Sequence, residues 1–189
     1  MSELGPDARD ALLKIARASV SAAVTGAEPP PLSDGDRVGE LAEMRGCFVT
    51  LKTHGDLRGC LGHFEADAPV AERVREMARA SALEDPRFFG NRIKPDELDD
   101  VDIEISVLTP REKVDDPLSI EAGRDGIYVR NGYRSGCYLP QVATELGWST
   151  EQFLSSCCAH KARLPADAWR DPETEVYRFR AQVFGTAHE

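Results

Sequence analysis

Residues 46–65 constrain the fold more than any other stretch of the chain, because they have the pattern of a β-hairpin. Residues 47–53 and 57–64 are rich in β-branched and apolar side chains, and His54-Gly55-Asp56 lies between the two runs. A short glycine-containing turn between two such runs is a strong local signal for a hairpin. We therefore expect two paired antiparallel strands.

Side chains alternate across a strand, so the second run divides between two faces of the sheet. One face is expected to hold Arg58, Cys60, Gly62 and Phe64, and the other Leu57, Gly59, Leu61 and His63. A two-residue turn, either His54-Gly55 or Gly55-Asp56, would put Cys47, Val49 and Leu51 on the Cys60 face. A three-residue loop would reverse that pairing, because a one-residue slip turns a strand over.

Arg58 and Cys60 are the candidate catalytic residues. A guanidinium on the same face as a thiol favours the thiolate, which is the reactive form of cysteine. Gly59 and Gly62 weaken a strand, which indicates close approach of a backbone or a ligand; with His63 they are the candidate ligand-binding residues. The alternative is that Cys60 packs in the core, where burial makes a thiol inert.

The composition is that of a soluble globular protein. The 189 residues are enough for one large domain or two small lobes with a buried core. The formal charge is −10, from 23 basic and 33 acidic residues, with no dense basic block. This charge argues against a nucleic-acid-binding or membrane-binding surface.

The cysteine count and the N-terminus indicate the compartment. Five cysteines at irregular spacing fit reduced thiols better than a disulfide framework. The first 19 residues lack the basic and apolar regions of a signal peptide, and no apolar run approaches the roughly 20 residues that span a bilayer. We expect a cytoplasmic protein.

The rest of the chain alternates between helical and strand patterns. Helices are expected over residues 7–25 before Gly26, 66–82, 140–146, and from the Ser149/Gln152 capping box to about 161. Strands are expected over 101–107, in a second hairpin (126–130 and 136–139) and in a closing strand (175–184). The proline-rich residues 28–35 are expected to form an extended connector, and five carboxylates within 96–102 are expected to face solvent. Hairpins interrupted by helices predict an α+β fold.

Several motifs together resemble one family. In order they are Phe48-Val49-Thr50-Leu51, Leu57-Arg58-Gly59-Cys60-Leu61-Gly62, Glu84-Asp85-Pro86-Arg87-Phe88, Ile105-Ser106-Val107-Leu108-Thr109, Gly126-Ile127, Leu139-Pro140-Gln141-Val142-Ala143 with Gly147-Trp148, Cys158 with Lys161-Ala162, and Leu164-Pro165 before Trp169. Through these residues the sequence resembles the AMMECR-type domain family, whose bacterial and archaeal members are known as AmmeMemoRadiSam system protein A. The resemblance runs from about residue 8 to about residue 184.

The resemblance implies an α+β fold with a central, mostly antiparallel sheet flanked by helices and two unequal lobes. It implies a single AMMECR-type domain over residues 1–189, and we expect residues 1–7 and 185–189 to be loose termini. It also implies a solvent-accessible cleft near residues 57–62, and partners that are a radical SAM enzyme and a Memo-like protein. The family's signature positions here are Arg58, Gly59, Cys60 and Gly62.

One departure from the family pattern concerns a helix end. The family commonly has Lys-Ala-Gly where this chain has Lys161-Ala162-Arg163. If that glycine caps the helix in a left-handed conformation, arginine there costs about 1 kcal/mol or forces a different exit.

Three functions are compatible with these residues. The first is an enzyme or enzyme subunit that uses Cys60, with Arg58 favouring its thiolate or binding an anionic substrate. The second is a non-catalytic component that binds a small molecule or docks onto a partner, which fits the absence of any complete catalytic or cofactor motif; we expect no cofactor. The third is a metal site from Cys157, Cys158 and His160. We expect no such site, because His160 points away from the helical face of the two cysteines.

Overall fold

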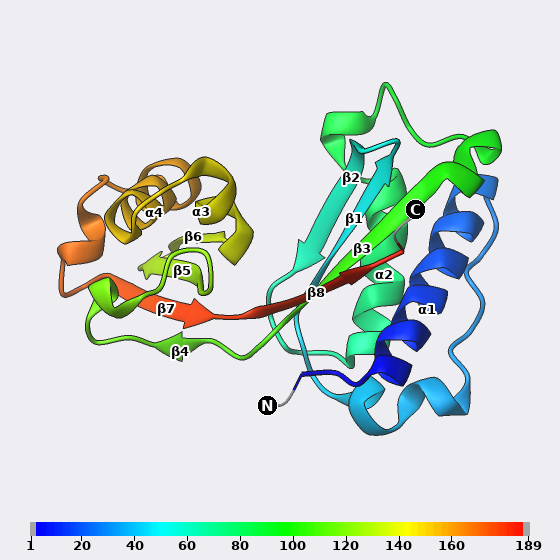
Figure 1. Ribbon diagram of the computed structural model, residues 1–189, viewed down its shortest axis with the longest axis horizontal. Helices are drawn as coiled ribbons and strands as arrows, with labels where there is room; N and C mark the ends of the chain where they lie inside the picture. Colours follow the sequence, from blue (N-terminus) through cyan, green and yellow to red (C-terminus); the bar gives the residue numbers. More distant parts are fainter. Residues whose placement is uncertain (1–2, 187–189) are drawn as a thin grey trace. The chain divides into compact units, whose positions relative to one another are not determined.

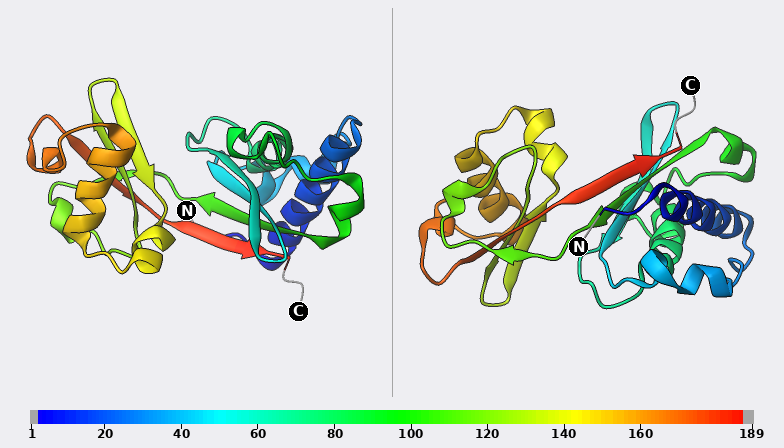
Figure 2. Two further views of the ribbon diagram at one scale, coloured as in Figure 1. Left: turned by 90° about the horizontal axis from the view of Figure 1, so that it is seen from above. Right: turned by 60° about the horizontal axis from the view of Figure 1, so that its bottom comes forward.

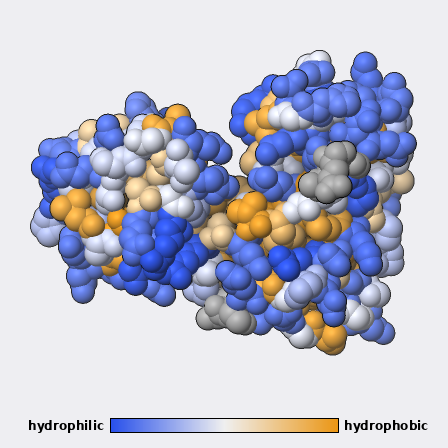
Figure 3. All heavy atoms as spheres, viewed as in Figure 1, coloured by the Kyte–Doolittle hydropathy of each residue, from blue (hydrophilic) through white to orange (hydrophobic). Residues whose placement is uncertain are grey.

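The computed structural model describes residues 3–186, which form two compact units. Unit 1 contains residues 3–108 and 182–186, and unit 2 contains residues 109–181 (Figure 1). Each unit combines helices with a four-stranded sheet, so the predicted α+β fold is confirmed. Polar side chains cover most of the face seen in Figure 3, and apolar residues gather there in small patches. Across residues 3–186, no helix has both the length and the apolar character needed to cross a bilayer.

The sheet of unit 1 is covered by two helices on one face. Its strands lie in the order β2 (Asp56–His63), β1 (Cys47–Thr53), β3 (Val101–Leu108) and β8 (Ala181–Gly185), and β1 is antiparallel to both β2 and β3. Helices α1 (Pro6–Thr25) and α2 (Val70–Leu83) pack against it (Figure 2). Every second residue of β1 is buried against these helices, including Val49 and Leu51.

Helix α1 begins and ends as its sequence predicts. Pro6 occupies the first turn, and Gly26 ends the helix in a left-handed conformation with φ 74°, which glycine adopts without steric cost. Of the termini that were expected to be loose, 1–7 and 185–189, residues 1–2 and 187–189 lie outside the described residues. Among the described residues, Leu4 is packed against the fold. Leu4 is buried, and its N–H donates to Oε1 of Gln182 over 2.8 Å.

The first hairpin is confirmed, but its register differs from the prediction. His54 and Gly55 form a two-residue turn with φ values of 53° and 85°, the positive values of a type I′ turn. β2 contains a β-bulge at Arg58, because Leu57 pairs with Lys52 and Gly59 already pairs with Leu51. The bulge turns over the rest of β2, so the predictions that Cys60 shares a face with Arg58 and with Val49 and Leu51 are wrong.

The sheet of unit 2 has the order β4 (Glu112–Lys113), β7 (Glu175–Phe179), β5 (Gly126–Asn131) and β6 (Arg134–Tyr138). Helices α3 (Pro140–Leu146) and α4 (Thr150–Ser156) and the π-helix η6 (Cys157–Ala162) belong to this unit. Short 3-10 helices complete the two units: η1 (Asp34–Arg37), η2 (Gly39–Ala42), η3 (Pro86–Phe88), η4 (Pro95–Asp100), η5 (Pro117–Ser119) and η7 (Ala168–Arg170).

Unit 2 agrees with the sequence predictions at three points and differs at one. The second hairpin and the capping box of Ser149 with Gln152 are both present. Arg163 ends η6 in a left-handed conformation with φ 56°. The helix therefore keeps the left-handed cap, with arginine in the glycine's place, and does not take a different exit. The predicted closing strand is instead two strands, β7 and β8, which separate at Arg180 and enter different sheets.

Candidate functional site

Cys60 lies on the face of the unit 1 sheet opposite the two helices. It pairs with Thr50 across β1 and β2, and paired residues of antiparallel strands project to the same face. Its side chain is half-buried, unlike that of Cys47, which is fully buried against the helices. The Thr50 hydroxyl donates a hydrogen bond to Sγ of Cys60 over 3.3 Å. A hydrogen bond donated to sulfur stabilises negative charge on that atom.

Asp85 and Arg87 cover the outer edge of β2 at Cys60. Asp85 caps the short helix η3, and its Oδ1 accepts the backbone N–H of Arg87. Its Oδ2 accepts the backbone N–H of Cys60 over 2.9 Å, while Nη2 of Arg87 donates to the carbonyl oxygen of Cys60 over 3.1 Å. Arg87 also binds Asp85 through Nε (2.9 Å) and Nη2 (2.6 Å). The two charged residues therefore fix the backbone that carries Cys60.

The electrostatics of this group follow from its hydrogen bonds. The side-chain bonds from Arg87 lower the pKa of Asp85 to about 2 against the effect of burial, and the N–H of Cys60 adds to the lowering. The pKa of Arg87 is raised, chiefly by Asp85 and to a smaller extent by the Cys60 side chain. Arg87, and not Arg58, is the cation that contacts Cys60, through the backbone carbonyl oxygen of that residue.

Arg58 lies on the opposite side of the sheet from Cys60, so the prediction that they share a face is wrong. The cause is the bulge, in which Arg58 is the extra residue between the pairs Lys52–Leu57 and Leu51–Gly59. Arg58 is buried, and its Nη1 donates to Oε1 of Glu97 over 2.7 Å and to the Thr53 hydroxyl over 3.3 Å. This bond to Arg58 lowers the pKa of Glu97 to about 2. Arg58 therefore ties the tip of the hairpin to η4.

Gly59 and Gly62 both lie where a side chain would collide with protein atoms. A Cβ at Gly59 would lie 2.1 Å from the carbonyl oxygen of Ser81 in α2, and one at Gly62 would lie 2.2 Å from the ring of Phe48. Glycine at these two positions predicted close approach of a backbone or a ligand. At Gly59 the neighbour is the backbone of α2, and at Gly62 it is the side chain of Phe48.

His63 is on the helix side of the sheet, because it pairs with Cys47. The prediction that it faces away from Cys60 is confirmed. Its Nε2 lies 3.4 Å from Oδ1 of Asp67. The geometry therefore does not bring His63 to the Cys60 thiol.

The AMMECR1 family model matches residues 13–184. The chain belongs to the AMMECR1 family. It is 45% identical over 187 residues to a protein of Methanothermobacter thermautotrophicus, covering 96% of this chain and 95% of the relative. It is 51% identical over 152 residues to a protein of Methanopyrus kandleri, covering 76% and 72%. A crystal structure titled as an uncharacterised protein from Pyrococcus horikoshii superposes with a TM-score of 0.86 at 38% identity, covering 98% of this chain and 94% of that one.

The other four cysteines of this AMMECR1 chain are poor nucleophiles. Burial raises the pKa of Cys47 to about 12 and that of Cys158 to about 11, and it also raises the pKa values of Cys137 and Cys157. Within residues 3–186, no three His, Cys, Asp or Glu side chains are grouped so that they could hold a metal ion.

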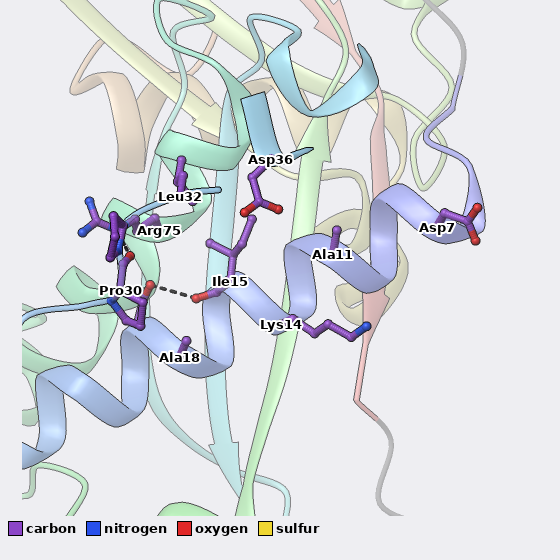
Figure 4. A pocket seen from close by; sticks show the side chains of 11 residues that line it. Asp7, Ala11, Lys14, Ile15, Ala18, Pro30, Leu32, Asp36 and Arg75 are labelled. Carbon is purple, nitrogen blue, oxygen red and sulfur yellow. Dashed lines mark hydrogen bonds between the residues drawn. The ribbon is translucent and has the colours of Figure 1, made fainter. Parts of the chain in front are cut away.

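A hollow of about 430 Å³ lies between α1 and the proline-rich connector (Figure 4). Ala11 and Ile15 form one wall, and Pro30 to Leu32 face them. Arg75 of α2 holds the connector by donating to the carbonyl oxygens of Pro29 and Pro30. Residues 57–62 do not line this hollow.

Sequence reasoning did not identify Thr50, Asp85 or Arg87 as neighbours of Cys60. Asp85-Pro86-Arg87 was visible as part of a family motif and as a helix break. The break explains the cap that Asp85 forms on η3. Its contact with a strand 25 residues earlier depends on how α2 packs against β2, which local sequence does not specify.

Proposed function

We propose that this chain is an enzyme or enzyme subunit in which Cys60 is the reacting group. The observation that carries the proposal is the surroundings of Cys60, whose Sγ accepts a hydrogen bond from Thr50 and whose carbonyl oxygen accepts one from the guanidinium of Arg87. In this reaction class the thiol proton passes to solvent, and the sulfur forms a bond to an electrophilic substrate atom. The electron pair of the bond that breaks moves to the substrate's leaving atom.

We also propose that the chain works with a radical SAM enzyme and a Memo-like protein. Its support is the family resemblance carried by the 57–62 motif and the motifs that follow it. Co-expression of the three proteins from one genome tests this, with co-purification as the measurement. If neither partner co-purifies, the partnership is contradicted.

Selective alkylation tests the role of Cys60. Under limiting iodoacetamide at pH 8, peptide mass spectrometry should find Cys60 modified at least about tenfold faster than Cys47, Cys157 and Cys158, because burial keeps those three thiols protonated and inaccessible. If Cys60 reacts no faster than Cys47 or Cys157, it is not a reactive thiol and the proposal fails.

A non-catalytic binding or docking role is the second candidate. Ser81 and Phe48 account for the absence of side chains at positions 59 and 62, so neither glycine requires a substrate beside it. Cys60→Ser separates the two candidates in the co-purified complex. A catalytic role predicts an intact complex with lost activity, and a docking role predicts that both are retained.

A further inference from the structure

The guanidinium of Arg87 is held in one orientation beside Cys60. Its Nε lies 2.9 Å from Oδ1 of Asp85, and its Nη2 lies 2.6 Å from Oδ2. Nη2 also lies 3.1 Å from the carbonyl oxygen of Cys60. Two-point binding to a carboxylate fixes the plane of a guanidinium, so the position of the third nitrogen, Nη1, is fixed as well.

The ion pair is oriented, with its negative end buried and its positive end exposed. The Asp85 side chain is 1% exposed and the Arg87 side chain is 56% exposed. Asp85 also accepts the backbone N–H groups of Cys60 and Arg87, which stabilise its charge. In the part of the chain that the structure describes, residues 3–186, Nη1 of Arg87 donates to no protein oxygen. The N–H groups of Nη1 are therefore available to a ligand, on a guanidinium that contacts the Cys60 backbone.

A charged N–H donor binds carboxylate and phosphate oxygens more strongly than a neutral donor does. A guanidinium already fixed by a neighbour loses little freedom on binding. Given the proposed reaction at Cys60, on which this inference rests, we propose that the substrate is a small organic anion. Its carboxylate or phosphate group binds Nη1 of Arg87 while its reactive atom meets Sγ of Cys60. Asp85 is the positioning residue for both.

Two alkylating reagents of different charge test the substrate class. Iodoacetate and iodoacetamide react identically at sulfur: the Sγ–C bond forms, the C–I bond breaks, iodide leaves with the bonding pair, and the thiol proton passes to the buffer. They differ only in carrying a carboxylate or a neutral amide. The measured quantity is the ratio of their rate constants at Cys60, taken from peptide mass spectrometry on the full chain.

The test variant is the double substitution Asp85→Asn with Arg87→Met, which removes both charges and leaves no unpaired buried carboxylate. We expect it to lower the iodoacetate to iodoacetamide ratio about fivefold, as loss of a half-exposed neighbouring cation should. Arg79→Ala is the control. Arg79 carries the same charge, but it lies on the side of α2 away from the sheet, about 200° around the helix from Ser81, which contacts the sheet. The iodoacetate to iodoacetamide ratio of Arg79→Ala should equal that of the unsubstituted protein.

A second measurement uses the unsubstituted protein and does not depend on how the variants fold. Inorganic phosphate, compared with chloride at equal ionic strength, should slow the reaction of Cys60 with neutral iodoacetamide by occupying Arg87. Equal rates in the two salts, or an unchanged reagent ratio in the double variant while Cys60 still reacts selectively, would overturn the inference and leave the proposed function standing. Failure of Cys60 to react selectively with either reagent would overturn the proposed function itself.

Discussion

Ser81 of α2 bridges the two strands of the first hairpin, and removing its hydroxyl should loosen β2 beside Cys60. The Oγ of Ser81 accepts the N–H of Leu61 over 2.9 Å and donates to the carbonyl oxygen of Val49 over 2.8 Å. Leu61 and Val49 are cross-strand partners, and Ser81 is 1% exposed. In Ser81→Ala, both backbone groups lose this partner in a place that water does not reach.

The expected cost follows from those two bonds. A neutral buried hydrogen bond contributes about 1 kcal/mol, and a buried polar group left unpaired costs about 1–3 kcal/mol. Small movements of the two strands recover part of this lost free energy. Alanine is also favoured over serine in a helix by about 0.5 kcal/mol. We expect a net loss of about 2 kcal/mol in the free energy of unfolding. For a chain of this length, this loss lowers Tm by about 4–8 °C.

The assay must follow unit 1. Both tryptophans, Trp148 and Trp169, belong to unit 2, so their fluorescence reports on the other unit. Urea unfolding followed by far-UV circular dichroism gives the free energy, and amide hydrogen exchange at Leu61 gives the local effect.

Ser19→Ala is the matched control for Ser81→Ala. Ser19 is also 1% exposed in a helix, but its hydroxyl donates only to the carbonyl oxygen of Ile15, one turn earlier in α1. Its replacement should change the free energy of unfolding by no more than about 0.5 kcal/mol. If Ser81→Ala is no more destabilising than Ser19→Ala, and Leu61 exchanges as slowly as before, the bridge does not hold the hairpin together.

Three further substitutions test other parts of the fold. Gly59→Ala should destabilise the chain by about 2–3 kcal/mol in urea unfolding, because the new Cβ meets the carbonyl oxygen of Ser81. Gly90→Ala is the control, since a Cβ there meets open space, and equal destabilisation by the two substitutions would refute the predicted collision. The pKa of Asp85 lies below its ordinary value, so its contribution is full above about pH 4 and is lost as the pH falls towards 2. Asp85→Asn should therefore lose less of its urea midpoint over that interval than the unsubstituted chain, and parallel pH curves would contradict the assignment. Arg163→Gly should raise the free energy of unfolding by about 0.5–1 kcal/mol, because glycine adopts the left-handed φ of 56° without strain. Urea unfolding followed by tryptophan fluorescence measures this, and a lower free energy of unfolding would mean that the arginine is not strained.

The elements that the sequence predicted correctly are those with a local physical cause. The end of α1 at Gly26 follows from glycine's freedom to adopt a positive φ. The cap at Ser149 follows from a side chain that reaches an N–H three residues ahead. The first hairpin follows from a turn that His54 and Gly55 can form by themselves.

The errors arise where distant segments decide the outcome. The bulge at Arg58 accompanies a buried arginine whose partner, Glu97, lies in η4, so alternation along β2 gave the wrong face. Residues 175–184 have the sequence pattern of a single strand, yet they form β7 and β8, which pair in different sheets. The guanidinium at Cys60 comes from Arg87, 27 residues away in the chain.

Neighbouring residues and an ordered set of motifs were enough to predict the family, the α+β class, the two hairpins and the cysteine at the centre of the motif. The cation that accompanies this cysteine could not be predicted in the same way, because it comes from a distant segment. Helix α2 carries Ser81 into the hairpin, and the turn that follows brings Asp85 and Arg87 to the edge of β2. A contact between segments this far apart is fixed by the packing of the helix on the sheet and not by the spacing of residues along a strand.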